Sequence, residues 1–139
     1  MEVNILQKID AYLEDILALT DISRSCVPLL RELIESKNKD GYIFVNSALK
    51  RLLSKKLDMA IGSIENTITK FVDKGILIRV DRGMYIANKD IVDFTVLKEH
   101  DDIKITIYYS DNGRNIKSMK TTKEQQKEVA LYDDRTKEK

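Results

Sequence analysis

The sequence of 139 residues contains one cysteine, Cys26, and one histidine, His100. A single cysteine cannot close a disulfide within the chain, and these two residues cannot supply the four ligands of a structural zinc site. A catalytic pair of the two is formally possible, but Cys26 begins an apolar helical pattern. A buried, inert thiol is therefore the favoured interpretation.

Glycine is also scarce, and its five residues are spread along the chain: Gly41, Gly62, Gly75, Gly83 and Gly113. Nucleotide-binding fingerprints need glycines within a few residues of one another, and that spacing is absent. Neighbouring carboxylates occur at 14–15, 101–102 and 133–134, but none is set in an apolar, pocket-like stretch. We therefore predict a protein that is not an enzyme and that needs no cofactor and no metal.

The sequence has no apolar run near 18 residues and no leader of basic, apolar and small residues. We expect a soluble, cytoplasmic protein with no membrane partner and no small-molecule substrate. Hydrophobic residues make up 42% of the chain, which is enough for one folded domain. Charged residues make up 34%, which indicates a large solvated surface.

The formal net charge of +1 conceals an uneven distribution. Residues 46–85 contain eight Lys and Arg against four Asp and Glu, a balance of +4, whereas residues 1–45 have a balance of −3 and residues 86–139 are neutral. A basic segment within a neutral chain is the electrostatic pattern of a nucleic-acid-binding region.

The strongest helical pattern covers residues 59–74, between Asp58, a candidate N-cap, and Gly75, a candidate left-handed C-cap. At about 100° per residue, its apolar side chains share one sector. These are Ile61, Ile64, Ile68, Phe71 and Val72. The opposite side carries Met59, Ser63, Asn66 and Lys70, accompanied by Gly62 and Thr67.

Short polar side chains on that side would let the helix approach base edges in a major groove, although an ordinary solvated face is the simpler alternative. Glu65 is the exception. Its carboxylate either accepts a hydrogen bond from a cytosine amine or faces water.

A second helix is predicted over residues 47–56, after the candidate cap Asn46, with Leu49, Leu52 and Leu53 on its buried side. Four cations remain outside: Lys50, Arg51, Lys55 and Lys56. In helix-turn-helix docking the first helix crosses the DNA backbone and the second enters the groove, so these cations are placed for phosphate contacts.

A hairpin is predicted after the second helix of this pair. Residues 76–80 and 84–87 form its strands, and Asp81-Arg82-Gly83 supplies the turn. Arg79 on the first strand and Arg82 at the tip are candidate DNA contacts, although a solvated arginine is the simpler alternative. Residues 42–45 are predicted to form a strand that pairs with this hairpin.

Residues 27–92 resemble the winged-helix region of RepL-type plasmid replication proteins of Firmicutes. The resemblance covers about half the chain and implies DNA binding at a replication origin, without catalysis. Its most telling parts are the Lys-Gly-Ile-Leu helix exit and the Gly-x-Tyr-x-x-Asn return strand, which also occur in winged-helix transcription regulators. The matching segments are Leu30-Arg31-Glu32-Leu33-Ile34, Asn46-Ser47-Ala48-Leu49, Ile64-Glu65-Asn66-Thr67-Ile68, Lys74-Gly75-Ile76-Leu77 and Gly83-Met84-Tyr85-Ile86-Ala87-Asn88.

The predicted organisation is α+β: an N-terminal helix (1–22), a winged helix-turn-helix (23–92), an extension (93–120) and a mobile charged tail (121–139). The N-terminal helix carries Leu6, Ile9, Leu13 and Ile16 on one stripe, which either packs on the domain's own core or forms a dimer. Residues 88–99 are predicted to form a short helix that buries Ile91, Phe94 and Leu97, although Thr95 and Val96 also suit a strand. The extension ends in a β-hairpin around Asp111-Asn112-Gly113.

We therefore predict sequence-specific binding of double-stranded DNA by a homodimer, associated through residues 3–19 or the later hairpin, in plasmid or phage replication or its regulation. A transcriptional regulator and a protein-interaction module are the alternatives. The candidate DNA-binding residues are Lys50, Arg51, Lys55, Lys56, Met59, Gly62, Ser63, Asn66, Thr67, Lys70, Arg79 and Arg82.

Overall fold

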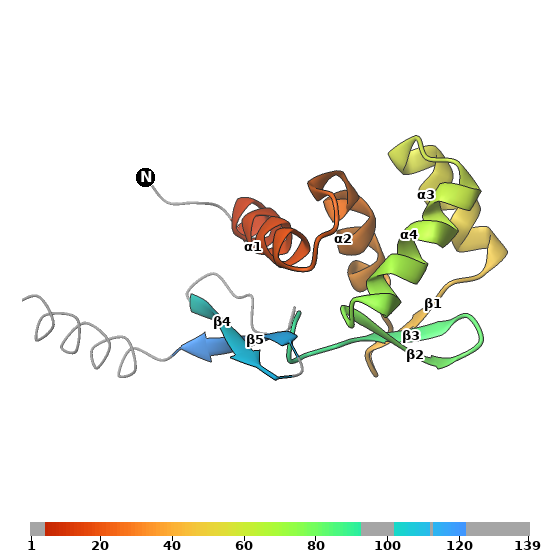
Figure 1. The fold of residues 1–139 in the computed structure, drawn as a ribbon. Helices are drawn as coiled ribbons and strands as arrows, with labels where there is room; N and C mark the ends of the chain where they lie inside the picture. The colour runs from red at the N-terminus through yellow and green to blue at the C-terminus, as the bar shows by residue number, and fades with distance from the viewer. Residues whose placement is uncertain (1–4, 93–101, 112, 122–139) are drawn as a thin grey trace, which may run out of the picture.

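The computed structural model describes residues 5–92, 102–111 and 113–121, which form an α+β fold, as predicted (Figure 1). Within these residues there are four α-helices, a short 3-10 helix and five strands. In chain order they are α1 (Ile5–Leu19), η1 (Arg24–Cys26), α2 (Val27–Glu35), β1 (Tyr42–Phe44), α3 (Ser47–Leu57), α4 (Ile61–Asp73), β2 (Leu77–Asp81), β3 (Met84–Ala87), β4 (Asp102–Ser110) and β5 (Gly113–Thr121).

The strands form two small antiparallel sheets that lie below the helices in Figure 1. The first sheet has the order β1-β3-β2, so the predicted hairpin exists and the short strand at Tyr42–Phe44 pairs with it, as expected. The second sheet is the β4-β5 hairpin, whose register places Ile107 opposite Ile116. The prediction of a later hairpin is therefore confirmed.

Local chemistry explains where α3 and α4 begin and end. The Leu49 backbone N–H donates to the Asn46 side-chain oxygen at 2.8 Å, which confirms Asn46 as the N-cap of α3. Gly75 has φ of +77°, and the Ile76 N–H donates to the Phe71 carbonyl oxygen at 2.9 Å. This is a Schellman termination of α4, and it needs a residue that tolerates a left-handed conformation.

The expectation that Asp58 is the N-cap of α4 is wrong. Asp58 has φ of 53° and ends α3, because its backbone N–H donates to the Ser54 carbonyl oxygen. The residue before α4 is Ala60, which has no side-chain acceptor for the first turn. The helix consequently begins at Ile61, two residues later than predicted.

The core lies between the helices and the inner faces of both sheets. Helix α1 contributes Ile9, Tyr12, Leu13, Ile16 and Leu17, all of which are buried against the same cluster as the apolar residues of α2. Of the two alternatives for the N-terminal stripe, packing on the chain's own core is the one observed. Burial of each Leu or Ile side chain in this cluster contributes about 1.5–3 kcal/mol to the stability of the folded state.

The β4-β5 hairpin packs on this core and is tied to α1 by polar contacts. Ile103, Ile105 and Ile116 lie against the core cluster. The Tyr12 hydroxyl is 2.7 Å from Ser118 Oγ and 2.9 Å from the Ile91 carbonyl oxygen, and the Ser118 hydroxyl donates to that same carbonyl. The three groups satisfy one another in a largely buried position, as buried polar groups require.

Two apolar side chains that were expected in the core are exposed, namely Leu52 and Ile61. Leu49, Leu53 and Leu57 of α3 follow a spacing of four and face the core, so Leu52 lies about 100° away on the open side. Ile61 is the first residue of α4 and precedes the buried stripe that starts at Ile64.

Residues 88–92, where a helix was predicted to begin, form a turn. The rest of that predicted helix, including Phe94 and Leu97, lies outside the described residues, as do His100 and residues 122–139 of the tail. Among the residues that are described, none of the helices combines the length and the apolar character that crossing a membrane requires.

Candidate nucleic-acid interface

Helix α4 presents a polar, exposed ridge on the side opposite its buried stripe. Ser63, Asn66 and Lys70 are exposed at spacings of three and four residues, with Gly62 beside them. Ile64, Ile68 and Phe71 are buried on the other side, as the periodicity predicted. The ridge therefore offers a hydroxyl, an amide and an ammonium group to solvent on a helix that the core holds rigidly.

Two candidate residues of this ridge do not belong to it. Thr67 is only 7% exposed, and its hydroxyl donates to the Ser63 carbonyl oxygen at 2.8 Å. It lies about 40° around the helix from Phe71, so its angular position already indicated the buried side. Met59 is half-buried in the turn before α4, where its side chain packs against the core.

A three-residue turn, residues 58–60, joins α3 to α4 and is held by two hydrogen bonds. The Met59 N–H donates to the Ser54 carbonyl oxygen at 3.1 Å, and the Ser54 hydroxyl donates to the Met59 carbonyl oxygen at 2.6 Å. Lys50 Nζ of α3 also lies 3.1 Å from Glu65 Oε1 of α4. The two helices are thus fixed relative to each other by packing, turn geometry and an ion pair.

That ion pair explains Glu65 and changes the interpretation of Lys50. The Glu65 carboxylate, the exception on the polar side of α4, is paired with Lys50 instead of standing alone. Opposite charges on two adjacent helices were the signal in the sequence, but the distance between them depends on how the helices cross.

The four cations of α3 divide into two pairs. Lys50 contacts Glu65, and Lys56 Nζ lies 2.9 Å from Glu32 Oε1 of α2. Arg51 and Lys55 are exposed, and within the described residues neither has an ion-pair partner. Arg51 and Lys55 are therefore the cations of α3 that are most available to an anionic ligand.

The β2-β3 hairpin supplies two further exposed cations. Arg79 is paired with Tyr85 across the strands and lies on the same sheet face as the buried Leu77, which is the face toward the helices. Arg82 occupies the turn, where its backbone N–H donates to Asp81 Oδ1 at 2.7 Å. Gly83 follows with φ of +70°, and its carbonyl oxygen accepts from the Val45 N–H at 2.8 Å.

The arrangement is suited to binding an anionic surface that also offers hydrogen-bonding groups. No group of three or more potential metal-ligating side chains occurs among the described residues. Cys26 is half-buried at the N-cap of α2, where it packs against the core. Comparisons with protein-family models, curated proteins and solved structures find no match to this chain.

Proposed function

We propose that this chain is a winged helix-turn-helix protein that binds double-stranded DNA by inserting α4 into the major groove. In this proposal α3 and α4 form the helix-turn-helix, and the β2-β3 hairpin with β1 forms the wing. The order α2, β1, α3, α4, β2, β3 and the sheet order β1-β3-β2 support this assignment.

The observation that carries the proposal is the exposed ridge of Ser63, Asn66 and Lys70 on a helix fixed behind a three-residue turn. A helix fits a B-DNA major groove, and asparagine can contact adenine through two hydrogen bonds. Short side chains beside it, including the glycine at 62, allow the helix backbone to approach the base edges.

The exposed cations give each part of the proposed complex a phosphate contact. Arg51 and Lys55 lie on the helix that would cross the DNA backbone, and Arg82 lies at the tip of the wing. Binding then releases counterions, so log affinity should fall linearly as log salt concentration rises. The process served is replication initiation or its control in a plasmid or phage, with transcriptional regulation as the second candidate.

The test compares variants of the two contact types on a duplex selected from a random library and on an unrelated duplex. Asn66→Ala and Ser63→Ala should lose about 1–3 kcal/mol on the selected site and little on the unrelated one. Lys55→Ala and Arg82→Ala should weaken both duplexes alike and reduce the salt slope by about one unit each. All four sites are exposed, so unfolding stability should stay within about 0.5 kcal/mol.

Two results would contradict the proposal. Binding that is absent at low salt, or that does not respond to salt, would exclude duplex DNA as the ligand. If the Asn66→Ala and Ser63→Ala proteins bind every sequence as the wild type does, α4 does not contact bases, and a winged helix that binds another protein becomes the better hypothesis.

A further inference from the structure

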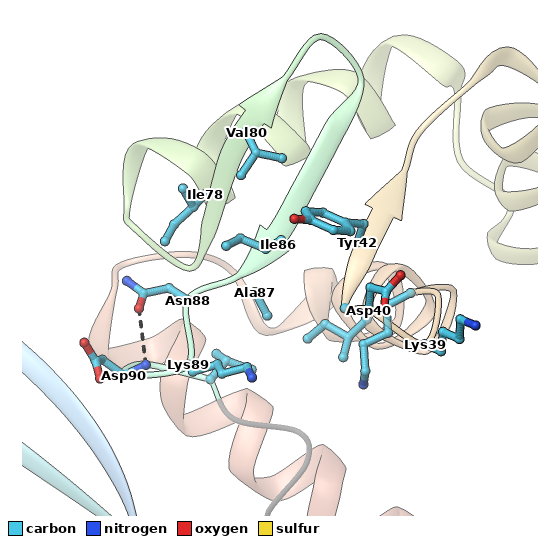
Figure 2. Close-up of a pocket in the computed structure, with 14 residues that line it drawn as sticks. Lys39, Asp40, Tyr42, Ile78, Val80, Ile86, Ala87, Asn88, Lys89 and Asp90 are labelled. Carbon is cyan, nitrogen blue, oxygen red and sulfur yellow. Dashed lines mark hydrogen bonds between the residues drawn. The ribbon is translucent and has the colours of Figure 1, made fainter.

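The outer face of the first sheet is apolar, although it points away from the helices. Figure 2 shows Ile78, Val80, Ile86 and Tyr42 projecting from three strands on the side opposite α4. The register explains this, because Tyr42 and Ile78 both pair with Ile86 in one row across the sheet. We call this surface the outer sheet face, and it consists of Tyr42, Phe44, Ile78, Val80, Met84 and Ile86. A bulge between Arg79 and Asp81 pairs Asp81 with Met84, so one carboxylate lies at the turn end of this face.

The exposure of this face is unusual for a solvated sheet. Phe44 is 50% exposed, Val80 44% and Ile78 42%. An antiparallel sheet with one face in water normally carries polar residues on that face, in alternation with the buried ones. Contiguous exposed apolar residues with a polar rim mark an interaction site.

The rim of this face has a positive and a negative residue on one side and another such pair on the opposite side. Lys39 and Asp40 precede β1, and Lys89 and Asp90 follow β3. Figure 2 shows these two charged pairs at the same end of the sheet, on opposite sides of a groove of about 560 Å³. A partner of uniform charge would meet a like charge on both sides of the groove.

We propose that a second copy of this chain covers the outer sheet face, with a two-fold axis that runs along β3. Such an axis brings the Lys39–Asp40 side of one copy to the Lys89–Asp90 side of the other. In the proposed contact Lys39 pairs with Asp90 and Asp40 pairs with Lys89. Residue Ile86 of the central strand then lies close to its own copy. The two sheets would pack face to face about 10 Å apart, as in other aligned sheet pairs.

Most apolar residues of the two segments that were expected to mediate association contact the core of the described part of the chain. Ile9, Leu13 and Ile16 of the α1 stripe are buried in the core, and Ile103, Ile105 and Ile116 of the β4-β5 hairpin pack on that core. Tyr108, Tyr109 and Met119 of this hairpin are exposed. The outer sheet face is the exposed apolar surface that has the charged pairs Lys39–Asp40 and Lys89–Asp90 at its rim. Its three short strands cover only roughly 15 Å by 15 Å. The rim must therefore contribute to reach the roughly 800 Å² per partner of a stable interface.

The first experiment is sedimentation velocity of the full chain without DNA, over a concentration series. Wild type should convert from monomer to dimer, and Ile78→Asp should raise the dissociation constant at least about tenfold, because a charge is placed in the apolar interface. Tyr109→Asp is the matched control, since Tyr109 is 79% exposed on the other hairpin. A monomeric wild type, or a dimer broken by Tyr109→Asp and not by Ile78→Asp, would overturn the proposal.

The second experiment tests the position of the axis. In a Cys26→Ser background, a short bis-maleimide linker should join Ile86→Cys to its copy much faster than it joins Tyr109→Cys, because the facing central strands are close but too far apart for a direct disulfide. Lys39→Asp should weaken the dimer, and the combination of Lys39→Asp with Asp90→Lys should restore it. Equal cross-linking at both positions, or no restoration in the double variant, would refute the two-fold arrangement. Both experiments are done without DNA. A negative result would therefore overturn the dimer proposal without bearing on the DNA-binding proposal.

Discussion

Lys50 and Lys55 lie five residues apart on α3 and carry the same charge, but their surroundings differ. The Lys50 ammonium group is held by the Glu65 carboxylate of α4, whereas Lys55 is exposed without an ion-pair partner among the described residues. An isolated, solvated cation and a paired one differ in the net charge that they present to a phosphate. Their positions in the sequence alone make the two lysines equal candidates for a phosphate contact.

This difference predicts unequal effects on DNA binding under the proposed function. Lys55→Ala should flatten the plot of log affinity against log salt by about one unit. Lys50→Ala should change the slope less, because Lys50 is paired with the Glu65 carboxylate and so neutralises no phosphate. The measurement is a salt titration of binding to one duplex for both variants. Equal slopes for Lys50→Ala and Lys55→Ala would show that Lys50 leaves Glu65 in the complex.

The same glycine-to-alanine change should have opposite effects at the two ends of α4. Gly75 has φ of +77°, so Gly75→Ala is expected to reduce the free energy of unfolding by about 1–2 kcal/mol. Gly62 has no atom within 4 Å of an added Cβ, so Gly62→Ala should increase it by about 0.5 kcal/mol. Urea denaturation of the two variants measures both changes in the free energy of unfolding. A loss of stability in Gly62→Ala would contradict the helical assignment at this residue.

At the scale of the element, the β4-β5 hairpin depends on its attachment, because an isolated two-stranded ribbon is only marginally stable in water. Tyr12→Phe removes a hydroxyl that contacts Ser118 and the Ile91 carbonyl oxygen. We expect a loss of about 1–3 kcal/mol and faster amide hydrogen exchange across β4 and β5.

The control on the same hairpin is Tyr109→Phe, an exposed tyrosine for which stability should stay within about 0.5 kcal/mol of wild type. If Tyr12→Phe leaves hydrogen exchange in the hairpin unchanged, the polar contact does not hold it, and the apolar packing of Ile103, Ile105 and Ile116 is sufficient.

At the scale of the molecule, α1 and α4 contribute to one core cluster, which implies one cooperative unit. Leu13 of α1 and Ile64 of α4 are both fully buried. Leu13→Ala and Ile64→Ala should each lower the stability of a single unfolding transition by about 2–5 kcal/mol. Calorimetry and circular dichroism should give the same midpoint. A separate early transition in Leu13→Ala alone would show that α1 unfolds as its own unit.

Short-range patterns were sufficient for much of this fold, because caps, turns and periodicity act within a few residues. Asn46 as an N-cap, Gly75 as a left-handed terminator and the Arg82-Gly83 turn follow from local backbone chemistry. The buried side of α4 from Ile64 to Phe71 follows from the period of a helix. The exposed positions of Ser63, Asn66 and Lys70 were therefore predictable.

Contacts between elements required the tertiary structure, because they depend on how helices cross and strands pair. The Lys50–Glu65 and Lys56–Glu32 ion pairs, the burial of the Tyr12 hydroxyl against Ser118, and the exposure of Leu52 belong to this class. The same holds for the outer sheet face, since only the pairing of β1 and β2 with β3 brings its residues together. The sequence by itself determined which segments become helices and strands, whereas packing decided which of their side chains remain available to a ligand.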